Sequence, residues 1–165
     1  MLMKNSVLKI TSLMIFAIII MATSAYSQVD KPIAQREKPQ KAPVERSKMV
    51  IDRTAKVIHE AHKALQQGKN YTGDLAAAVK HQKYAIQLHK EGKYKLAAEH
   101  SLYARKRAVK VLKANNVDVN PMYEKQPKNA ENLTPDSELE QAVSNLPDEN
   151  EQELVKENTL EITVK

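Results

Sequence analysis

The chain has 165 residues, with no cysteine, no tryptophan, one phenylalanine and three glycines, and its 26 basic against 20 acidic residues give a net charge of +6. The length allows one domain with flanking segments, and the absence of cysteine excludes disulfides, thiolate zinc sites, iron–sulfur clusters and cysteine nucleophiles. So few glycines argue against the loops and walled pocket that most enzymes need. We therefore expect a protein that is not an enzyme.

The first residues have the features of a secretory signal peptide. Lys4 and Lys9 precede an apolar run over residues 10–22, and small residues follow in Ala25-Tyr26-Ser27. This order is typical of a cleaved export signal, so we expect residues 1–27 to be removed and the mature chain to be periplasmic or extracellular. The alternative is an uncleaved membrane anchor, but the run is short against the roughly 20 residues that span a bilayer. After cleavage, no transmembrane segment is expected.

Proline and glycine divide the mature chain into three parts. All seven prolines fall outside residues 44–120, and all three glycines fall inside that window. Proline breaks helix interiors and glycine ends helices. The pattern predicts a flexible linker at 28–46, a helical domain at 47–116, and a mostly disordered tail at 117–165 with a short helix at 135–146.

Apolar residues at spacings of three and four predict three helices in the central part, at 44–67, 75–91 and 94–114. Gly68 and Gly92 are expected to end the first two, and Thr72 or Asp74 to cap the second. Short connections make neighbouring helices antiparallel. The predicted fold is all-α: a small antiparallel three-helix bundle, or a helical hairpin with an extra helix, flanked by disordered segments.

The predicted core is thin because alanine supplies many of its positions. Alanine buries little apolar area at about 25 cal/mol per Å², and a domain of this size is marginal by itself. Without disulfides, further stability has to come from close helix packing, a partner protein or a homo-oligomer.

One segment of the helical domain, residues 81–109, resembles a single helix-turn-helix unit of the tetratricopeptide repeat family. The matching positions are Ala85, Gly92, Tyr94, Ala97 and Ala104. His81, Ser101 and Val109 depart from the large aromatics and the closing proline of that family. Arrays of such units need about three copies for stability. The resemblance implies a protein-binding module and assigns no binding residue.

All five histidines lie in the helical domain, and three of them, His62, His81 and His100, follow at intervals of 19 residues. Antiparallel helices would bring these three to similar levels. Imidazoles gathered between helices can hold zinc or copper, and His59 offers a further ligand one turn before His62. This pattern supports an alternative function as a histidine-based metal carrier. The competing interpretation is that the histidines fill space beside the alanines, in which case no cofactor is expected.

Charge is divided sharply along the chain. Residues 47–116 hold 15 Lys and Arg against 5 Asp and Glu, whereas residues 117–165 hold 4 against 12. Basic helical faces with an aromatic residue attract anionic surfaces. The candidate binding residues are Lys80, Lys83, Tyr103, Arg105, Lys106, Arg107, Lys110 and Lys113.

These features together predict a non-catalytic, exported interaction module that binds an envelope protein or an anionic cell-envelope polymer through its basic faces. Export argues against an intracellular nucleic acid as the partner. We expect the acidic tail to lie on the basic helices until an anionic partner displaces it. The last stretch, residues 159–164, alternates with period two, which indicates either a frayed end or a strand added to a partner's sheet edge.

Overall fold

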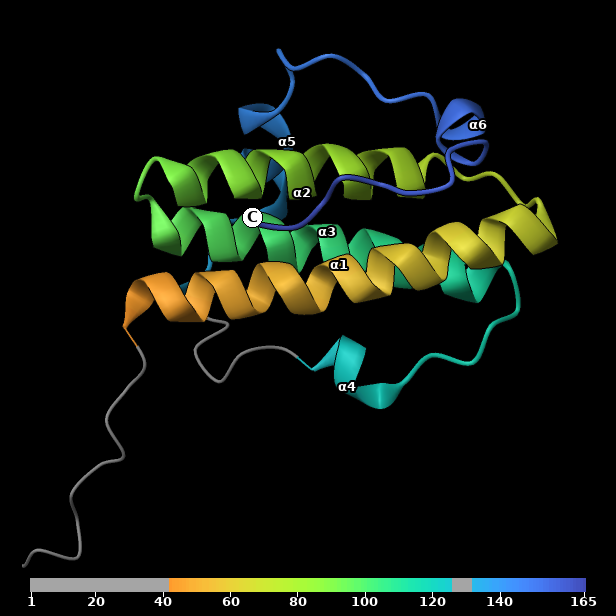
Figure 1. Cartoon of the computed structure of the whole chain (residues 1–165), viewed down its shortest axis with the longest axis horizontal. Helices are drawn as coiled ribbons and strands as arrows, with labels where there is room; N and C mark the ends of the chain where they lie inside the picture. The colour runs from red at the N-terminus through yellow and green to blue at the C-terminus, as the bar shows by residue number, and fades with distance from the viewer. Residues whose placement is uncertain (1–41, 126–131) are drawn as a thin grey trace, which may run out of the picture. The chain divides into compact units, whose positions relative to one another are not determined.

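The computed structural model describes residues 42–125 and 132–165, which form helices and contain no strand (Figure 1). The expected signal peptide and most of the expected linker lie outside the described residues. Within the described ranges, no helix is long and apolar enough to cross a membrane. In chain order the helices are α1 (Pro43–Gly68), α2 (Asp74–Lys90), α3 (Tyr94–Ala114), α4 (Pro121–Glu124), α5 (Asp136–Ala142) and α6 (Glu151–Leu154).

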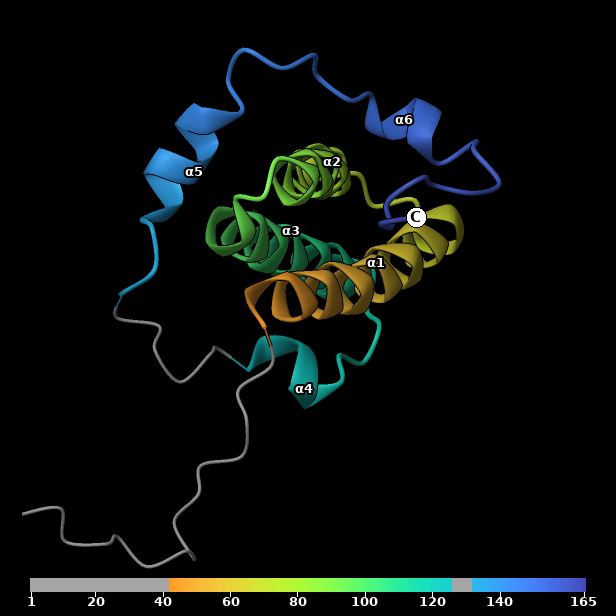
Figure 2. The same ribbon diagram turned by 60° about the vertical axis from the view of Figure 1, so that its left-hand side comes forward.

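The three long helices pack against one another, which confirms the predicted all-α bundle (Figure 2). Each of their bounds lies within one residue of the predicted one. The predicted linker boundary at residue 46 is wrong, because α1 already begins at Pro43. A proline is tolerated in the first helical turn since its missing N–H would have no intrahelical partner there.

The end of α1 shows a different role for glycine from the expected one. Gly68 is the last helical residue, and it is Lys69 that adopts the left-handed conformation, with a φ of 56°. Gly68 is needed for space, since a Cβ there would lie 2.3 Å from Oδ1 of Asn115. The same oxygen accepts a hydrogen bond of 3.0 Å from the backbone N–H of Asn70. The turn after α1 is thereby held against the end of α3.

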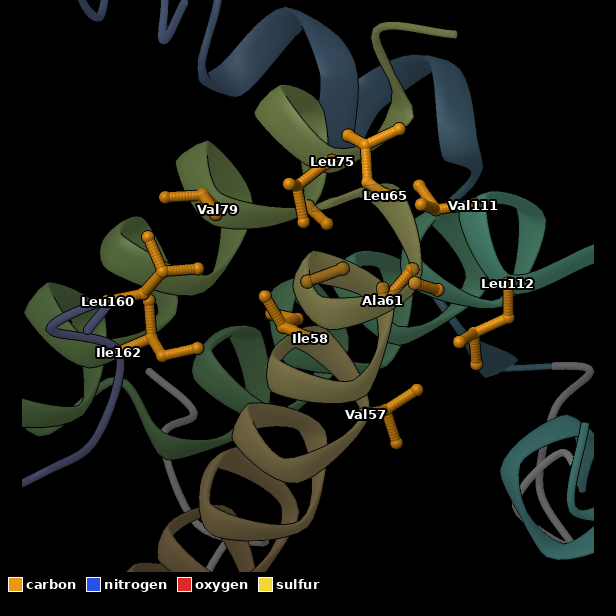
Figure 3. Packing of buried hydrophobic residues seen from close by; sticks show 14 of the residues in the cluster. Val57, Ile58, Ala61, Leu65, Leu75, Val79, Val111, Leu112, Leu160 and Ile162 are labelled. Atoms are coloured by element: carbon orange, nitrogen blue, oxygen red, sulfur yellow. The ribbon is translucent and has the colours of Figure 1, made fainter. Parts of the chain in front are cut away.

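The main core combines the three long helices with the far end of the chain (Figure 3). Ile58 and Leu65 come from α1, and Val79 comes from α2. Leu160 and Ile162 enter the same buried cluster from beyond α6 (Figure 3). Figures 1 and 2 both show this last part of the chain running along α1 and α2. The bundle is therefore completed by residues outside its three helices.

The expectation of a mostly disordered tail is wrong for residues 132–165. This part of the chain carries α5 and α6, and α5 lies within the helix predicted at 135–146. Five of its apolar side chains are buried: Leu139, Val143, Leu154, Leu160 and Ile162. Burial of these side chains stabilises the tail on the bundle. Residues 151–165 are called the closing segment below.

The end of the closing segment is neither frayed nor part of a sheet. Leu160 and Ile162 are buried, whereas Thr159, Glu161 and Thr163 are exposed. The period-two pattern thus does mark an extended chain with one apolar face. Its partner is the protein's own bundle.

The first turn of α2 is capped by a residue from the closing segment. The N-cap position is Gly73, which has no side chain to offer. The carboxylate of Glu151 accepts hydrogen bonds of 2.8 Å from the backbone N–H groups of Gly73 and Leu75. A carboxylate at this position satisfies unpaired N–H groups and is also favoured by the helix dipole. The expected cap by Thr72 is present beside it, since the Thr72 hydroxyl accepts a 3.3 Å hydrogen bond from the backbone N–H of Asp74, whereas the Asp74 side chain pairs with Arg107 instead.

Burial of the closing segment predicts that truncating one of its apolar side chains lowers the free energy of unfolding. Ile162→Ala removes a side chain that is 0% exposed and should lower the free energy of unfolding by about 2 to 5 kcal/mol, as for other buried isoleucines. Thr163→Ala, at the exposed neighbouring position, should change it by less than about 0.5 kcal/mol. Urea unfolding followed by circular dichroism measures both values. Equally small changes for the two variants would contradict the packing of Ile162 on the bundle.

Candidate anion-binding site

The eight predicted binding residues form two groups that adjoin along α3, where Arg107 and Lys110 both contact Asp74. One group faces the acidic tail on the side of α2 and α3: Lys80, Lys83, Tyr103 and Arg107. The other group lines a cleft between α3 and α4: Arg105, Lys106, Lys110 and Lys113. α4 lies on the opposite side of the bundle from α5 and α6 (Figure 2). The two groups thus differ in most of their surroundings, although Lys106 of the second group also pairs with Asp136 of α5.

The tail-facing lysines and Arg107 are already paired. Lys80 Nζ lies 2.8 Å from Asp148, and Lys83 Nζ lies 2.6 Å from Glu149. Arg107 forms ion pairs with Asp74, at 2.9 Å, and with Glu140 of α5. The acidic tail thus does pair with the basic helices, as the charge division predicts. This face is used within the chain and offers little unbalanced positive charge.

Glu140 connects the tail to a buried pair of histidines. It accepts a 2.5 Å hydrogen bond from the Tyr103 hydroxyl, and its other oxygen lies 3.5 Å from Nε2 of His81. Nδ1 of His81 lies 3.0 Å from Nδ1 of His100, and both rings are almost completely buried. If Nε2 of His81 donates to Glu140, Nδ1 of His81 accepts a hydrogen bond from Nδ1–H of His100. A single hydrogen-bonded chain then runs from the bundle interior to α5.

Burial and charge shift the pKa values along this chain. Burial lowers the pKa of His100 to about 4, helped by the adjacent His81, and burial also lowers the pKa of His81. Burial works against ionisation of Glu140, but hydrogen bonds from Tyr103 and Arg107 outweigh it and lower the pKa of Glu140 to about 2. Around neutral pH the histidines are therefore neutral and the carboxylate is ionised.

The histidines predicted as metal ligands are separated in the structure. His59 is exposed, and Nε2 of His62 donates to the carbonyl of Leu154 at 2.8 Å. Only His81 and His100 lie together. Among the residues that the structure describes, no group of three or more histidine, aspartate or glutamate side chains is arranged to hold a metal ion. The metal site stays a prediction.

The cleft between α3 and α4 has a volume of about 230 Å³ and is strongly basic. Tyr123 of α4 donates to Glu60 of α1 at 2.8 Å, and Glu124 pairs with Lys113, so α4 is fixed to the bundle. The cleft is lined by Leu102, Arg105, Lys106, Val109, Lys110, Lys113, Tyr123, Glu124 and Lys125. The lining of the cleft thus contains five cationic side chains and one carboxylate. Such an arrangement attracts anionic groups.

Arg105 is a cleft cation that donates its hydrogen bonds to neutral groups. Its guanidinium donates to the Thr54 hydroxyl at 3.0 and 3.2 Å and to the Val50 carbonyl at 3.4 Å. In the described part of the chain no carboxylate pairs with it. Burial lowers its pKa, and the positive charge of Arg53 adds to this effect. A partly buried cation bonded only to neutral groups favours an incoming anion, which would form charge-assisted hydrogen bonds with it.

Sequence reasoning missed Glu140, Tyr123 and Lys125. Glu140 lies 59 residues from His81 and 33 from Arg107, and no local pattern links such positions. A weak signal for α4 was available in Asn120-Pro121, since Asn120 caps the helix by accepting from Met122 N–H at 2.9 Å. An asparagine before a proline is a common helix start.

The buried histidines predict a loss of stability in acid. Because their folded pKa values lie below the ordinary 6.5, the unfolded chain takes up protons that the folded chain does not. Stability should fall as the pH drops from about 6.5 towards 4, by at most roughly 1.4 kcal/mol per pH unit for each histidine. His100→Gln should flatten this decline, measured by urea unfolding between pH 8 and 4. An unchanged slope would contradict the prediction.

Comparison with known proteins adds no relative: no family model matches the sequence, and no curated protein or solved structure matches it. The resemblance of residues 81–109 to a tetratricopeptide repeat unit therefore stays a prediction. Its small positions, Ala85, Ala97 and Ala104, are each completely buried. Any function has to be argued from the residues of this chain.

Proposed function

We propose that this protein is an exported, non-catalytic interaction module that binds an anionic polymer in the cleft between α3 and α4. The observation that carries the proposal is the charge of the cleft, five cations against one carboxylate. Arg105 contributes a guanidinium without a carboxylate partner among the described residues. Export, inferred from residues 1–27, makes the cell envelope the place to look for such a polymer.

The spacing of the lysines favours a chain molecule over a single ion. Lys106, Lys110 and Lys113 follow each other along one face of α3, at helical spacings of four and three. With a rise of 1.5 Å per residue they extend over about 10 Å. A polymer with repeated anionic groups can meet several of these charges at once. An acidic segment of an envelope protein would be a second source of such charges, and the experiment below separates the two.

Two of the carboxylates in contact with the cleft lysines can be displaced, whereas Asp74, which lies 3.9 Å from Lys110, is 15% exposed and also paired with Arg107. Lys106 pairs with Asp136 and Lys113 pairs with Glu124, and these carboxylates are 54% and 47% exposed. Exposed ion pairs contribute only about 0 to 1 kcal/mol because water screens them. An incoming polymer would replace them at little cost. The acidic tail would then remain anchored through its buried apolar residues.

Neutralising the cleft should weaken polymer binding. The triple variant Lys110→Gln, Lys113→Gln and Lys125→Gln should elute from heparin at lower salt than the wild-type protein. The logarithm of its binding constant should also fall less steeply with salt, the slope changing by roughly 2 as fewer counterions are released.

A matched control distinguishes the effect of the cleft lysines on heparin retention from the effect of net charge. Lys83→Gln, Lys90→Gln and Lys93→Gln remove the same charge from α2 and the turn after it. This triple should leave heparin retention nearly as in the wild type. Equal losses in both triples would overturn the proposal. Retention of an acidic polypeptide but not of heparin or teichoic-acid-type polyanions would assign the cleft to a protein partner.

The alternative function, a histidine-based metal carrier, has one geometric feature in its favour. The facing Nδ1 atoms of His81 and His100 are 3.0 Å apart, so a metal ion between them would replace their shared hydrogen bond. Zinc or copper at equimolar concentration should then raise the melting temperature of the wild type but not of His81→Gln. An equal effect on both proteins, or no effect on either, would remove this function.

A further inference from the structure

We infer that α1 and α2 form a binding site for an extended segment, that the closing segment occupies this site in the single chain, and that the closing segment of a second copy can take its place. The site, called the tail site, consists of Ile58, Val79 and Gln82 with the backbone N–H groups at the start of α2. It is separate from the cleft between α3 and α4. The inference does not depend on the proposed polymer binding.

The apolar part of the tail site accepts alternate side chains of an extended chain. Leu160 and Ile162 lie beside Val79 and Ile58 (Figure 3) and belong to the same buried cluster. Leu154, at the end of α6, is buried in that cluster as well. Because the intervening residues face solvent, the bundle contacts one face of the segment. This is the way in which extended peptides are recognised in protein–peptide complexes.

Polar side chains of α1 and α2 bind the backbone of the closing segment. Gln82 is fully buried and donates from Nε2 to the carbonyl of Ile162 at 3.0 Å. Its orientation is set by Ser101, which donates to Oε1 of Gln82 at 3.0 Å. From α1, His62 donates to the carbonyl of Leu154 at 2.8 Å, and Gln66 donates to the next carbonyl at 2.9 Å. These contacts do not depend on side chains of the closing segment.

One side chain of the closing segment adds a charged contact. Glu151 places both carboxylate oxygens on backbone N–H groups at the start of α2, each at 2.8 Å. The tail site therefore selects an acidic residue, then leucine three positions later, then the Leu160-Glu161-Ile162 pattern. A second copy of the chain carries this pattern by identity. A second copy therefore fits the tail site at each of these contacts.

The connection to the closing segment is long enough to reach another molecule. Residues 143–150 join α5 to α6; Val143 is buried, and beyond it Lys80 and Lys83 pair with Asp148 and Glu149 of the remaining seven residues. Seven extended residues span at most about 25 Å, which exceeds the roughly 10 Å diameter of a helix. Each ion pair has one well-exposed partner, Asp148 at 97% and Lys83 at 49%, so solvent screening keeps its contribution modest. The segment can therefore leave its own bundle without unfolding α5.

The chain's own segment has an advantage at low concentration. A short tether gives it an effective concentration in the millimolar range, so the dilute protein is expected to keep its own closing segment. Exchange of identical elements makes the same contacts in a dimer as in the monomer. Exchanged dimers should therefore form when the protein folds at high concentration. They should also form when the contact within one chain is weakened.

The first experiment tests whether the tail site binds a segment from outside. The acceptor is the full chain with Leu160→Ser and Ile162→Ser, and the probe is a labelled peptide of residues 149–165. The acceptor should bind this peptide, measured by fluorescence anisotropy, and its melting temperature should rise. A peptide with the same two serines should bind roughly 100-fold more weakly, because two buried aliphatic contacts are lost.

A matched acceptor provides the control. Thr159→Ser with Thr163→Ser changes two exposed positions of the same segment and should bind the peptide far more weakly, since its own segment still occupies the site. If the first acceptor does not fold alone, recovery of its helical circular dichroism on addition of the peptide gives the same information. Absence of both binding and recovery would overturn the inference.

The second experiment tests the second copy directly and uses the absence of cysteine from the chain. Nζ of Lys48 lies 3.5 Å from the carbonyl of Val164, so Lys48→Cys and Val164→Cys mark the two sides of the contact. The two single-cysteine chains are unfolded, refolded together at high concentration and treated with a short bismaleimide. A crosslinked heterodimer should form.

Two controls define the result of the crosslinking. Adding Leu160→Ser and Ile162→Ser to the Val164→Cys chain should abolish the heterodimer, and so should moving the acceptor cysteine to Met122 in α4. Refolding at low micromolar concentration should give only uncrosslinked monomers. Peptide binding without any heterodimer would overturn the assignment of a second copy as the partner.

Discussion

The packing of Leu160 and Ile162 onto α1 and α2 is the contact on which the rest of the structure depends. The helices are rich in alanine, which allows close approach but buries little area. Val79 and Ile58 would be less covered without the closing segment, and the Gln82 amide would lose the carbonyl of Ile162, one of its two acceptors. Burial of an unpaired polar group costs about 1 to 3 kcal/mol. The closing segment therefore covers apolar side chains of the bundle and also supplies a hydrogen-bond acceptor for Gln82.

The charge division follows from the same architecture. The tail side of the bundle is neutralised within the chain, because Lys80, Lys83 and Arg107 each hold a tail carboxylate. The α3–α4 side keeps an excess of positive charge around Arg105. The net charge of +6 is thus spread unevenly, because one surface of the bundle is nearly neutral and the other is basic. Only one of them has positive charge left for a partner.

The three long helices could be predicted because their periodicity and their glycine boundaries are local properties. The site was predictable only in part, since helical spacing places Lys106, Lys110 and Lys113 on one face but cannot show that α4 covers it. The alternation at residues 159–164 correctly indicates an extended segment with one apolar face. It carries no information on what covers that face. The link from His81 to Glu140 was beyond prediction for the same reason, as the two residues are 59 positions apart.

The cap that Glu151 places on α2 has a consequence for biosynthesis. A ribosome makes Gly73 and Leu75 long before Glu151, which lies 78 and 76 residues later. During that interval the first turn of α2 lacks its carboxylate and the core lacks Leu160 and Ile162. A nascent or prematurely terminated chain therefore stays loosely packed and open to proteases. Synthesis of residues 151–165 is what supplies the α2 cap and the last side chains of the core.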